Sequence, residues 1–207
     1  MALTIIGGTR KGKKLISPKG MAVRPTSGRV REALFNILMH EIEAATVLDL
    51  FAGTGALALE ALSRGAAKAV LIDNDPASLA VIEKNITACG LQAVATAIRH
   101  DALRDLACLK PLGMTFDLVF LDPPYTIGAL GSVLAHLHAS GTLVPGAWVV
   151  AEHSRKTAAD DTLRAGLPFA LTDRRKYGKT GVSFFRYMLK MPMNGGTPPS
   201  EQPHDAG

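Results

Sequence analysis

The sequence predicts an α/β fold: a mostly parallel sheet of seven strands with helices on both faces and an antiparallel hairpin at its C-terminal end. From residue 46 onward, short apolar runs typical of buried strands alternate with segments of helical periodicity. Repeated strand–helix units favour a parallel sheet that is covered on both faces. Near the end of the chain, two further strand-like runs flank a glycine-bearing turn at residues 178–181, which predicts the hairpin.

The individual elements follow from the apolar runs and the turn residues between them. Strands are expected at residues 46–50, 68–73, 94–100, 116–122, 147–152, 167–177 and 182–191. Helices are expected at residues 56–63, 76–89 and 128–138, and an earlier helix begins near residue 27. This first helix has a single apolar face, because apolar residues recur there at helical spacing: Val30, Leu34, Ile37 and Leu38.

The N-terminus is expected to form a small β-hairpin. Two short apolar runs within residues 3–17 flank a loop rich in glycine and lysine. Such a loop should be flexible, and its backbone can approach a ligand closely. We therefore divide the chain into a basic arm (1–25), a main domain (26–191) and a disordered tail (192–207).

Composition points to a cytoplasmic protein of one main domain. The 207 residues are 47% apolar, enough for a core. No apolar run approaches the ~18 residues of a membrane span, and basic residues follow the first apolar residues instead of preceding them, unlike in a signal peptide. Cys89 and Cys108 have no ligand-like spacing, so we interpret them as free thiols and expect no metal site.

Positive charge is concentrated at the two ends of the chain. Residues 1–31 contain eight Lys and Arg, and residues 174–190 contain six, with no acid in either segment. Residues 32–173 have nine bases and sixteen acids. This distribution favours a nucleic acid held at the ends, although basic arms that are merely solvated are the alternative. The candidate phosphate contacts are Arg10, Lys11, Lys13, Lys14, Arg24 and Arg29. Arg29 and Arg31 lie in the first turn of a helix, where a cation is tolerable if an anion binds.

The stretch Asp122-Pro123-Pro124-Tyr125 is the strongest candidate for chemistry. It follows a buried strand, and open α/β sheets place their chemistry at the carboxyl ends of strands. Proline removes a backbone donor and fixes φ, so the stretch offers acceptors beside the face of Tyr125. Such a site suits a planar group with N–H donors, for example the amino group of a nucleobase. An ordinary strand-ending turn with an exposed tyrosine is the alternative.

Three earlier strands also end in acids: Asp49, Asp73 and Asp101 follow the first, second and third strands. Gly53 and Gly55, after Asp49, permit a tight turn close to a ligand. An acid before this turn would repel a pyrophosphate and suits a cationic ligand such as S-adenosylmethionine. Asp73 can accept from ribose hydroxyls, and Asp101 from the adenine amino group.

These residues together resemble a known family. The segment DLFAGTG, an acidic end to the second strand and the later D-P-P-Y are similar to class I S-adenosylmethionine-dependent methyltransferases, which have a Rossmann-like fold. The segments IIGGTRKGKKL, RPTSGRVREALFNIL and DLFAGTGALALEALSRGA resemble the bacterial 16S ribosomal RNA guanine-N2 methyltransferases. The resemblance spans about residues 3–190.

The resemblance implies specific roles. The methionine part of the cofactor would contact Asp49, Phe51, Gly53 and Gly55, the ribose would contact Asp73, and the adenine Asp101. Asp75 lies two residues after Asp73, so the ribose contact could be shared. Asp122, Pro123, Pro124 and Tyr125 would hold the target guanine, and the basic arm would hold the phosphates of 16S ribosomal RNA, either free or in an assembled or assembling 30S subunit. Residues 26–191 would form the methyltransferase domain.

Other functions remain possible on the sequence alone. A DNA adenine-N6 methyltransferase would share the chemistry but usually needs a larger target-recognition segment. A non-catalytic nucleic-acid-binding module would be expected to lose the acceptors of residues 122–125. A nicotinamide-dependent oxidoreductase is disfavoured by Asp49 and by Ala58 at the third position of the dinucleotide fingerprint. His136, His138 and His153 are interpreted as structural or exposed.

Overall fold

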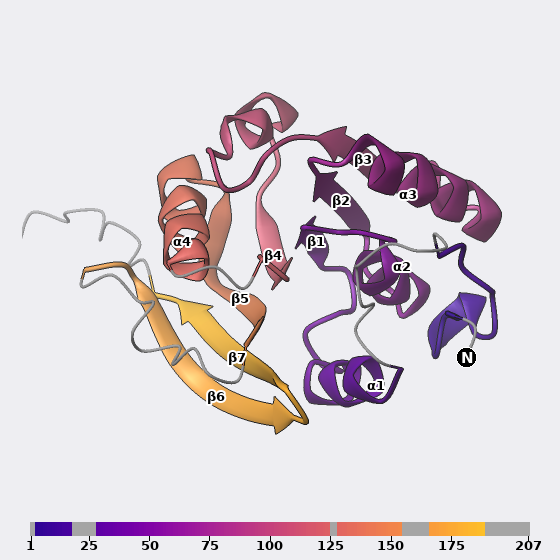
Figure 1. Ribbon diagram of the computed structural model, residues 1–207, viewed down its shortest axis with the longest axis horizontal. Helices are drawn as coiled ribbons and strands as arrows, with labels where there is room; N and C mark the ends of the chain where they lie inside the picture. The colour runs from indigo at the N-terminus through magenta and orange to yellow at the C-terminus, as the bar shows by residue number, and fades with distance from the viewer. Residues whose placement is uncertain (1–2, 18–27, 125–127, 155–165, 189–207) are drawn as a thin grey trace, which may run out of the picture.

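The computed structural model describes residues 3–17, 28–124, 128–154 and 166–188. A seven-stranded sheet in the order β3-β2-β1-β4-β5-β7-β6 forms its centre (Figure 1). The strands are β1 (Thr46–Leu50), β2 (Lys68–Asp73), β3 (Ala95–Arg99), β4 (Phe116–Leu121), β5 (Leu143–Ser154), β6 (Phe169–Tyr177) and β7 (Thr180–Tyr187). The first five are parallel, β7 is antiparallel to β5, and β6 is antiparallel to β7. The predicted fold class is therefore confirmed.

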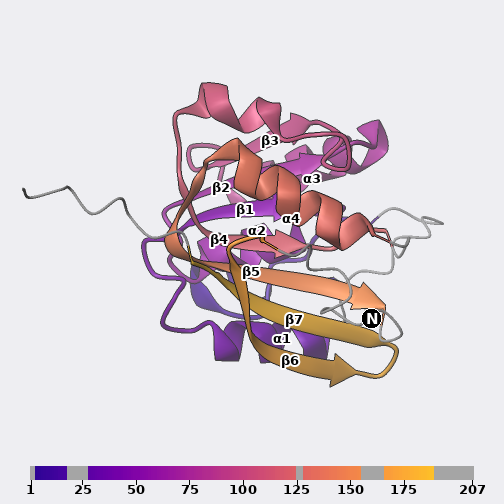
Figure 2. The same cartoon turned by 90° about the vertical axis from the view of Figure 1, so that its left-hand side faces the viewer.

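Helices cover both faces of the sheet. They are α1 (Gly28–Ile37), α2 (Ala56–Ser63), α3 (Pro76–Cys89) and α4 (Ala129–Ser140), with short 3-10 turns η1 (Gly8–Arg10) and η2 (Ala107–Leu112). The first three helices share one apolar core with alternate residues of the strands, and α4 and η2 share the other (Figures 1 and 2). Because side chains alternate along a strand, Val47 and Leu48 enter opposite cores.

The bounds of most elements agree with the sequence, and the last two strands differ in an informative way. The turn of the β6–β7 hairpin is only Gly178-Lys179, because Tyr177 and Thr180 are already paired. Gly181, which we expected in the turn, belongs to β7 and lies against the ring of His153, where an added Cβ would come within 2.6 Å of Cε1. Glycine is therefore needed at position 181 because the His153 ring packs against it, and not because of the conformation of the turn.

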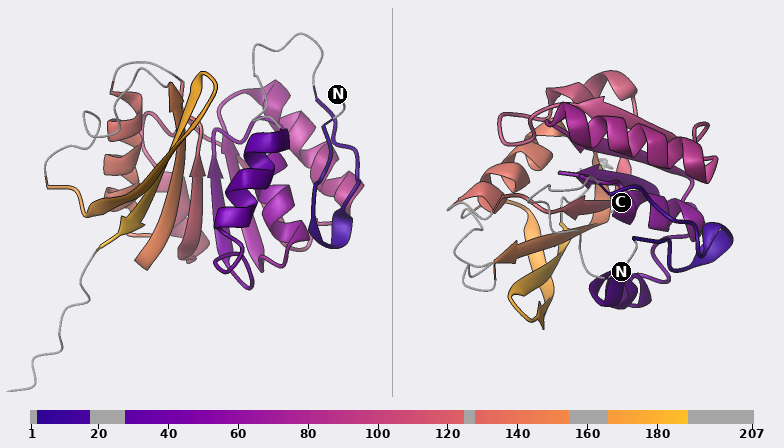
Figure 3. Two further views of the ribbon diagram at one scale, coloured as in Figure 1. Left: turned by 90° about the horizontal axis from the view of Figure 1, so that it is seen from below. Right: turned by 45° about the vertical axis from the view of Figure 1, so that its right-hand side comes forward.

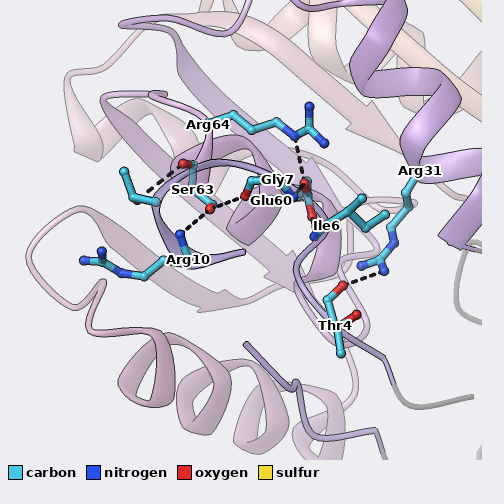
Figure 4. A network of polar contacts seen from close by, with 9 residues as sticks. Thr4, Ile6, Gly7, Arg10, Arg31, Glu60, Ser63 and Arg64 are labelled. Atoms are coloured by element: carbon cyan, nitrogen blue, oxygen red, sulfur yellow. Dashed lines mark hydrogen bonds and ion pairs between the residues drawn. The ribbon is translucent and has the colours of Figure 1, made fainter. Parts of the chain in front are cut away.

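The N-terminal hairpin is present in reduced form, as one antiparallel bridge between Thr4 and Lys14. The expectation of a flexible glycine loop is wrong, because the loop packs on the end of α2 (Figure 4). Glu60, which is fully buried, accepts hydrogen bonds from the backbone N–H groups of Ile6 and Gly7 at 2.7 and 2.8 Å. A Cβ on Gly8, which has φ +73°, would lie 1.8 Å from the carbonyl oxygen of Ser63. The glycines therefore permit close docking.

The first helix also departs from its predicted face. Ile37 is 40% exposed, and Phe35 is buried in its place, 5.8 Å from the ring of Phe120. Arg31 is buried too, and its Nη2 donates to the Thr4 carbonyl at 2.8 Å. Burial lowers the pKa of Arg31, and the nearby Glu60 charge raises it. Arg31 therefore attaches the arm to α1, and the expected anion site in this turn is limited to the exposed Arg29.

Among the helices that the structure describes, none is long and apolar enough to cross a membrane. Within the same residues, no group of three or more His, Cys, Asp and Glu is placed to hold a metal ion. The expected arm boundary near residue 25 and the tail at 192–207 lie outside the described residues.

Candidate active site

The candidate site lies where the sheet changes direction. β1 pairs with β2 on one side and with β4 on the other, so the chain winds outward both ways from β1 and β4. In open α/β sheets, ligands bind outside the carboxyl ends of the strands at such a switch point. Asp49 lies at this end of β1, and Asp122 directly follows β4. The structure thus brings two of the predicted site residues to the expected location.

Three acids of this edge lie on one face of the sheet. Asp49 pairs with Phe120 across the parallel strands, and Phe120 pairs with Val150. Because side chains alternate, Asp122 and Glu152 follow Phe120 and Val150 on the same face as Asp49. Burial, with smaller contributions from the charges of Glu152 and Asp49, raises the pKa of Asp122 to about 8. The three carboxyl groups therefore form an electrostatically coupled cluster.

Asp49 has the most restricted environment of the three acids. It is 3% exposed, and its Oδ2 accepts a hydrogen bond from the backbone N–H of Ala58 at 3.1 Å. Gly55 is the N-cap of α2 and has no side chain, so Asp49 supplies the missing acceptor from the neighbouring strand. Burial raises the pKa of Asp49 to about 7; the Ala58 hydrogen bond lowers it and the Asp73 charge raises it.

The loop between β1 and α2 follows an unusual backbone path. Phe51, Gly53 and Gly55 all have positive φ, at 63°, 56° and 73°. A Cβ at Gly55 would lie 2.8 Å from Leu71, so this position needs glycine for both conformation and space. Phe51 is not glycine, and left-handed backbone at such a residue is costly and concentrates at functional sites.

Asp73 fixes this loop in place. Its Oδ2 accepts from the Gly53 N–H at 2.8 Å, and its Oδ1 accepts from the Asp75 N–H at 2.9 Å. Asp75 itself caps α3 by accepting from the backbone of Ala77 and Ser78. Asp75 is therefore committed to the helix, which leaves Asp73 as the acid that faces the glycine loop.

Asp101 is exposed after β3, and its Oδ1 accepts from the Leu103 N–H at 3.0 Å in a local turn. Pro123 is buried and Pro124 is exposed, whereas Tyr125 lies outside the described residues. Of the predicted D-P-P-Y stretch, the structure thus places the carboxylate and both prolines.

Glu152 is the site residue that the sequence reasoning missed. It lies near the end of β5, next to Asp122 across the strand pair, and its charge contributes to the raised pKa of Asp122. A signal was available, because Val150-Ala151-Glu152 repeats the apolar-to-acid ending of Phe120-Leu121-Asp122.

The predicted phosphate contacts of the arm lie away from this edge. Lys11, Lys13 and Lys14 are exposed. Arg10 is also exposed, and its Nε donates to the carbonyl of Cys89 at the C-terminal end of α3, at 2.8 Å. Since α2 and α3 begin at the site edge, the tip of the arm packs near their far ends (Figure 3). Arg24 lies outside the described residues.

The described residues fit a cationic ligand such as S-adenosylmethionine. Oδ1 of Asp49 has no hydrogen-bond partner in the described part of the chain, and it belongs to a buried acid beside the glycine loop. A buried carboxyl with an available oxygen matches an ammonium or sulfonium group and opposes a phosphate.

Comparisons with known proteins agree with this geometry. A family described as conserved hypothetical protein 95 matches residues 3–186. Ribosomal RNA small subunit methyltransferase D of Escherichia coli is 42% identical over 151 residues, which cover 72% of this chain and 74% of the relative. The protein YlbH of Bacillus subtilis is 32% identical over 184 residues, which cover 89% and 98%. The solved structure of yhhF from Escherichia coli has a TM-score of 0.77 at 32% identity, covering 92% of this chain and all of that one. The chain therefore belongs to the ribosomal RNA small subunit methyltransferase D family.

Proposed function

We propose that this chain transfers a methyl group from S-adenosylmethionine to the exocyclic N2 amino group of a guanine in 16S ribosomal RNA. The observation that carries the proposal is the position of Asp122 and Pro123 at the switch point, beside the buried Asp49 and its glycine loop. The Escherichia coli relative is a small-subunit ribosomal RNA methyltransferase by name, which supports small-subunit ribosomal RNA as the substrate class.

The cofactor would be held by the residues around the β1–α2 loop. Asp49 would face the amino group, Phe51, Gly53 and Gly55 the methionine part, Asp73 the ribose and Asp101 the adenine. When bound, S-adenosylmethionine supplies an electrophilic methyl group on a sulfonium. Asp73 already orients the loop through the Gly53 N–H, and in this proposal its carboxylate would also contact the ribose.

Asp122 would act on the nitrogen that receives the methyl group. The N2 lone pair of guanine is conjugated into the ring, so N2 is a poor nucleophile. Hydrogen bonds from its two hydrogens to Asp122 Oδ and the Pro123 carbonyl favour a pyramidal nitrogen, and Tyr125 would stack on the base. Positioning of this kind is worth roughly 7–11 kcal/mol in well-oriented reactions.

The same carboxylate can dispose of the proton. Methylation places positive charge on N2, and a carboxylate at hydrogen-bond distance stabilises that charge. In the free protein the pKa of Asp122 is about 8, so Asp122 is largely protonated at neutral pH. It takes the proton that N2 releases in its ionised form, which a bound cation favours. No base strong enough to ionise N2 beforehand is required.

A product analysis tests the proposal. The protein is incubated with methyl-labelled S-adenosylmethionine and, separately, with 30S subunits, protein-free 16S RNA or duplex DNA. Label in N2-methylguanosine from either RNA substrate is the expected result. Label in N6-methyladenosine from DNA, or no label in any nucleic acid, would contradict it.

The division of roles predicts a selective loss of transfer in Asp122→Ala. Methyl transfer should fall by at least ~10²-fold, because a positioned acceptor is removed, while affinity for S-adenosylmethionine in calorimetry stays near wild type. Asp117→Ala is the matched control: Asp117 lies at the opposite end of β4 and accepts from the Thr46 N–H at 2.8 Å. A comparable loss of cofactor binding in Asp122→Ala would refute the division.

A further inference from the structure

We propose that the turn of the β6–β7 hairpin is a second phosphate-binding surface, which holds the RNA strand next to the target base. We call the exposed Lys176 and Lys179 the basic turn. The inference rests on the proposed function for the identity of the nucleic acid. It places a phosphate contact near the target base on the C-terminal hairpin, and not at the tip of the arm.

Strand register places the basic turn at the catalytic edge. β5 runs parallel to β4, with Leu121 paired to Ala151, so both strands end at the same edge of the sheet. β7 is antiparallel to β5 and pairs Thr180 with Ser154, so it starts at that edge. The turn lies beside the end of β5 in Figure 2. With strands about 4.8 Å apart, the turn lies roughly 10–14 Å from Asp122, a span of a few nucleotides.

The charges of the two neighbouring surfaces are opposite. Asp49, Asp122 and Glu152 form a cluster of acids, which offers no positive charge to a phosphate group. Lys176 and Lys179 are exposed, and neither has an ion-pair partner among the described residues, whereas Arg175 pairs with Asp173 at 2.7 Å. An RNA strand that inserts one base at Asp122 can therefore reach two exposed cations at the basic turn.

The turn is held firmly on the body of the protein. The ring of His153, near the end of β5, packs on the backbone of Gly181 and lies 2.8 Å from Oγ of Ser183 through Nε2. Burial lowers the pKa of His153, so the imidazole stays neutral and maintains this contact. A phosphate contact on such a support can help to position the strand as well as attract it.

The tip of the arm is less suited to this task. η1 packs against the last residues of α2, and Arg10 is bonded to the last residue of α3. These helices have eight and fourteen residues and begin at the catalytic edge, so their far ends lie about 12 and 21 Å away from it. In the left view of Figure 3 the β6–β7 turn lies at the top of the molecule, and η1 lies apart from it at the lower right.

The competing interpretation is that the lysines only protect an edge strand. β6 is the last strand of the sheet, and charged side chains on edges prevent pairing between copies. That interpretation predicts self-association when the lysines are removed and no change in RNA binding.

The test compares Lys176→Gln/Lys179→Gln with the control Lys68→Gln/Lys110→Gln, which removes the same charge from exposed positions toward the opposite edge. Binding of protein-free 16S RNA is measured as a function of potassium chloride concentration. Two lost phosphate contacts should reduce the slope of log K against log salt by about 1.4, from ~0.7 per contact with single strands. The control slope, and the affinity of both variants for S-adenosylmethionine, should equal those of wild type.

Failure of the inference can be told from failure of the proposed function. An unchanged salt slope in Lys176→Gln/Lys179→Gln overturns the inference. If this variant also self-associates, the lysines protect the edge strand instead of binding RNA. Absence of methyl transfer by wild type overturns the proposed function but leaves the slope measurement intact. A reduced slope together with a raised KM for 16S RNA supports the basic turn.

Discussion

Replacing the buried Asp49 with asparagine should stabilise the protein increasingly as the pH rises. The structure raises the pKa of Asp49 from the ordinary 3.8 to about 7, chiefly by burial. The folded chain therefore binds this proton more tightly than the unfolded chain does. Consequently, wild-type stability falls as the pH rises from 3.8 to about 7 and then levels off.

The magnitude follows from these two pKa values. One unit corresponds to about 1.36 kcal/mol. The raised pKa therefore costs the folded state ~4 kcal/mol at pH 8, where Asp49 must ionise in the buried site, and about 1.7 kcal/mol at pH 5, where it must take up a proton. The asparagine of the Asp49→Asn variant carries no such cost. Its amide group can still accept from the Ala58 N–H, and any fixed cost of burying the amide is the same at both pH values. The free energy of unfolding of Asp49→Asn, relative to that of wild type, should therefore be about 2.5 kcal/mol more favourable at pH 8 than at pH 5.

Urea unfolding followed by the fluorescence of the single tryptophan, Trp148, measures this difference. Asp75→Asn is the control: the Ala77 N–H lowers the pKa of Asp75, so this variant should be destabilised by the same amount at pH 5 and at pH 8. The carboxylate of Asp75 contributes stability above its ordinary pKa, and that contribution is lost as the pH falls. A difference between Asp49→Asn and wild type that does not change between pH 5 and pH 8 would refute the reasoning. The stabilised variant should also bind S-adenosylmethionine poorly.

Three further predictions concern the cofactor and the arm. Affinity for S-adenosylmethionine should rise with pH and level off above about 7, since the Asp49 carboxyl must release its proton to face the cofactor's ammonium group; a flat calorimetric profile between pH 6 and pH 9 would contradict this. Neutralising Lys11, Lys13 and Lys14 should lower the salt slope of RNA binding by up to about 2, and an unchanged slope would mean that these lysines do not contact RNA. Glu60→Ala should destabilise the fold by about 3–5 kcal/mol, because it leaves buried N–H groups and Arg64 without their acceptor; a loss below ~1 kcal/mol in urea unfolding would show that the arm docks without it.

The sequence was sufficient for features that depend on local pattern. Short apolar runs located β1 and β2, and the Pro76 and Gly90 signals bounded α3 as observed. Contacts between distant segments could not be predicted in this way. Gly8 has the composition of a flexible loop, yet its role is set by the carbonyl of Ser63, far along the chain. Ile37 fits the helical period, but Phe35 is buried because Phe120 of β4 packs against it.

The same distinction applies to the site. Asp49 and Asp122 were predictable because acids after buried strands collect at one edge of a parallel sheet. Their raised pKa values were not, since these depend on burial by elements remote in sequence and on the charges of neighbouring acids, Asp73 for Asp49 and Glu152 and Asp49 for Asp122. Glu152 ended the expected strand 147–152, but its effect on Asp122 depends on β5 lying next to β4, and this strand order is not written in the local pattern. β5 extends to Ser154, and its pairing with β4 contains a register shift between Phe116 and Leu118.

The raised pKa values of Asp49 and Asp122 mean that the free protein carries an electrostatic cost at the catalytic edge of the sheet. Three acids share a partly buried edge, and burial disfavours the ionised forms of Asp49 and Asp122. A cationic ligand at this edge removes that cost by favouring ionisation, so cofactor binding prepares Asp122 as a charged acceptor for the amino group of the base. The cofactor is therefore expected to strengthen binding of the target base as well as to supply its methyl group, and the nearby basic turn offsets the repulsion between the acidic edge and the RNA backbone.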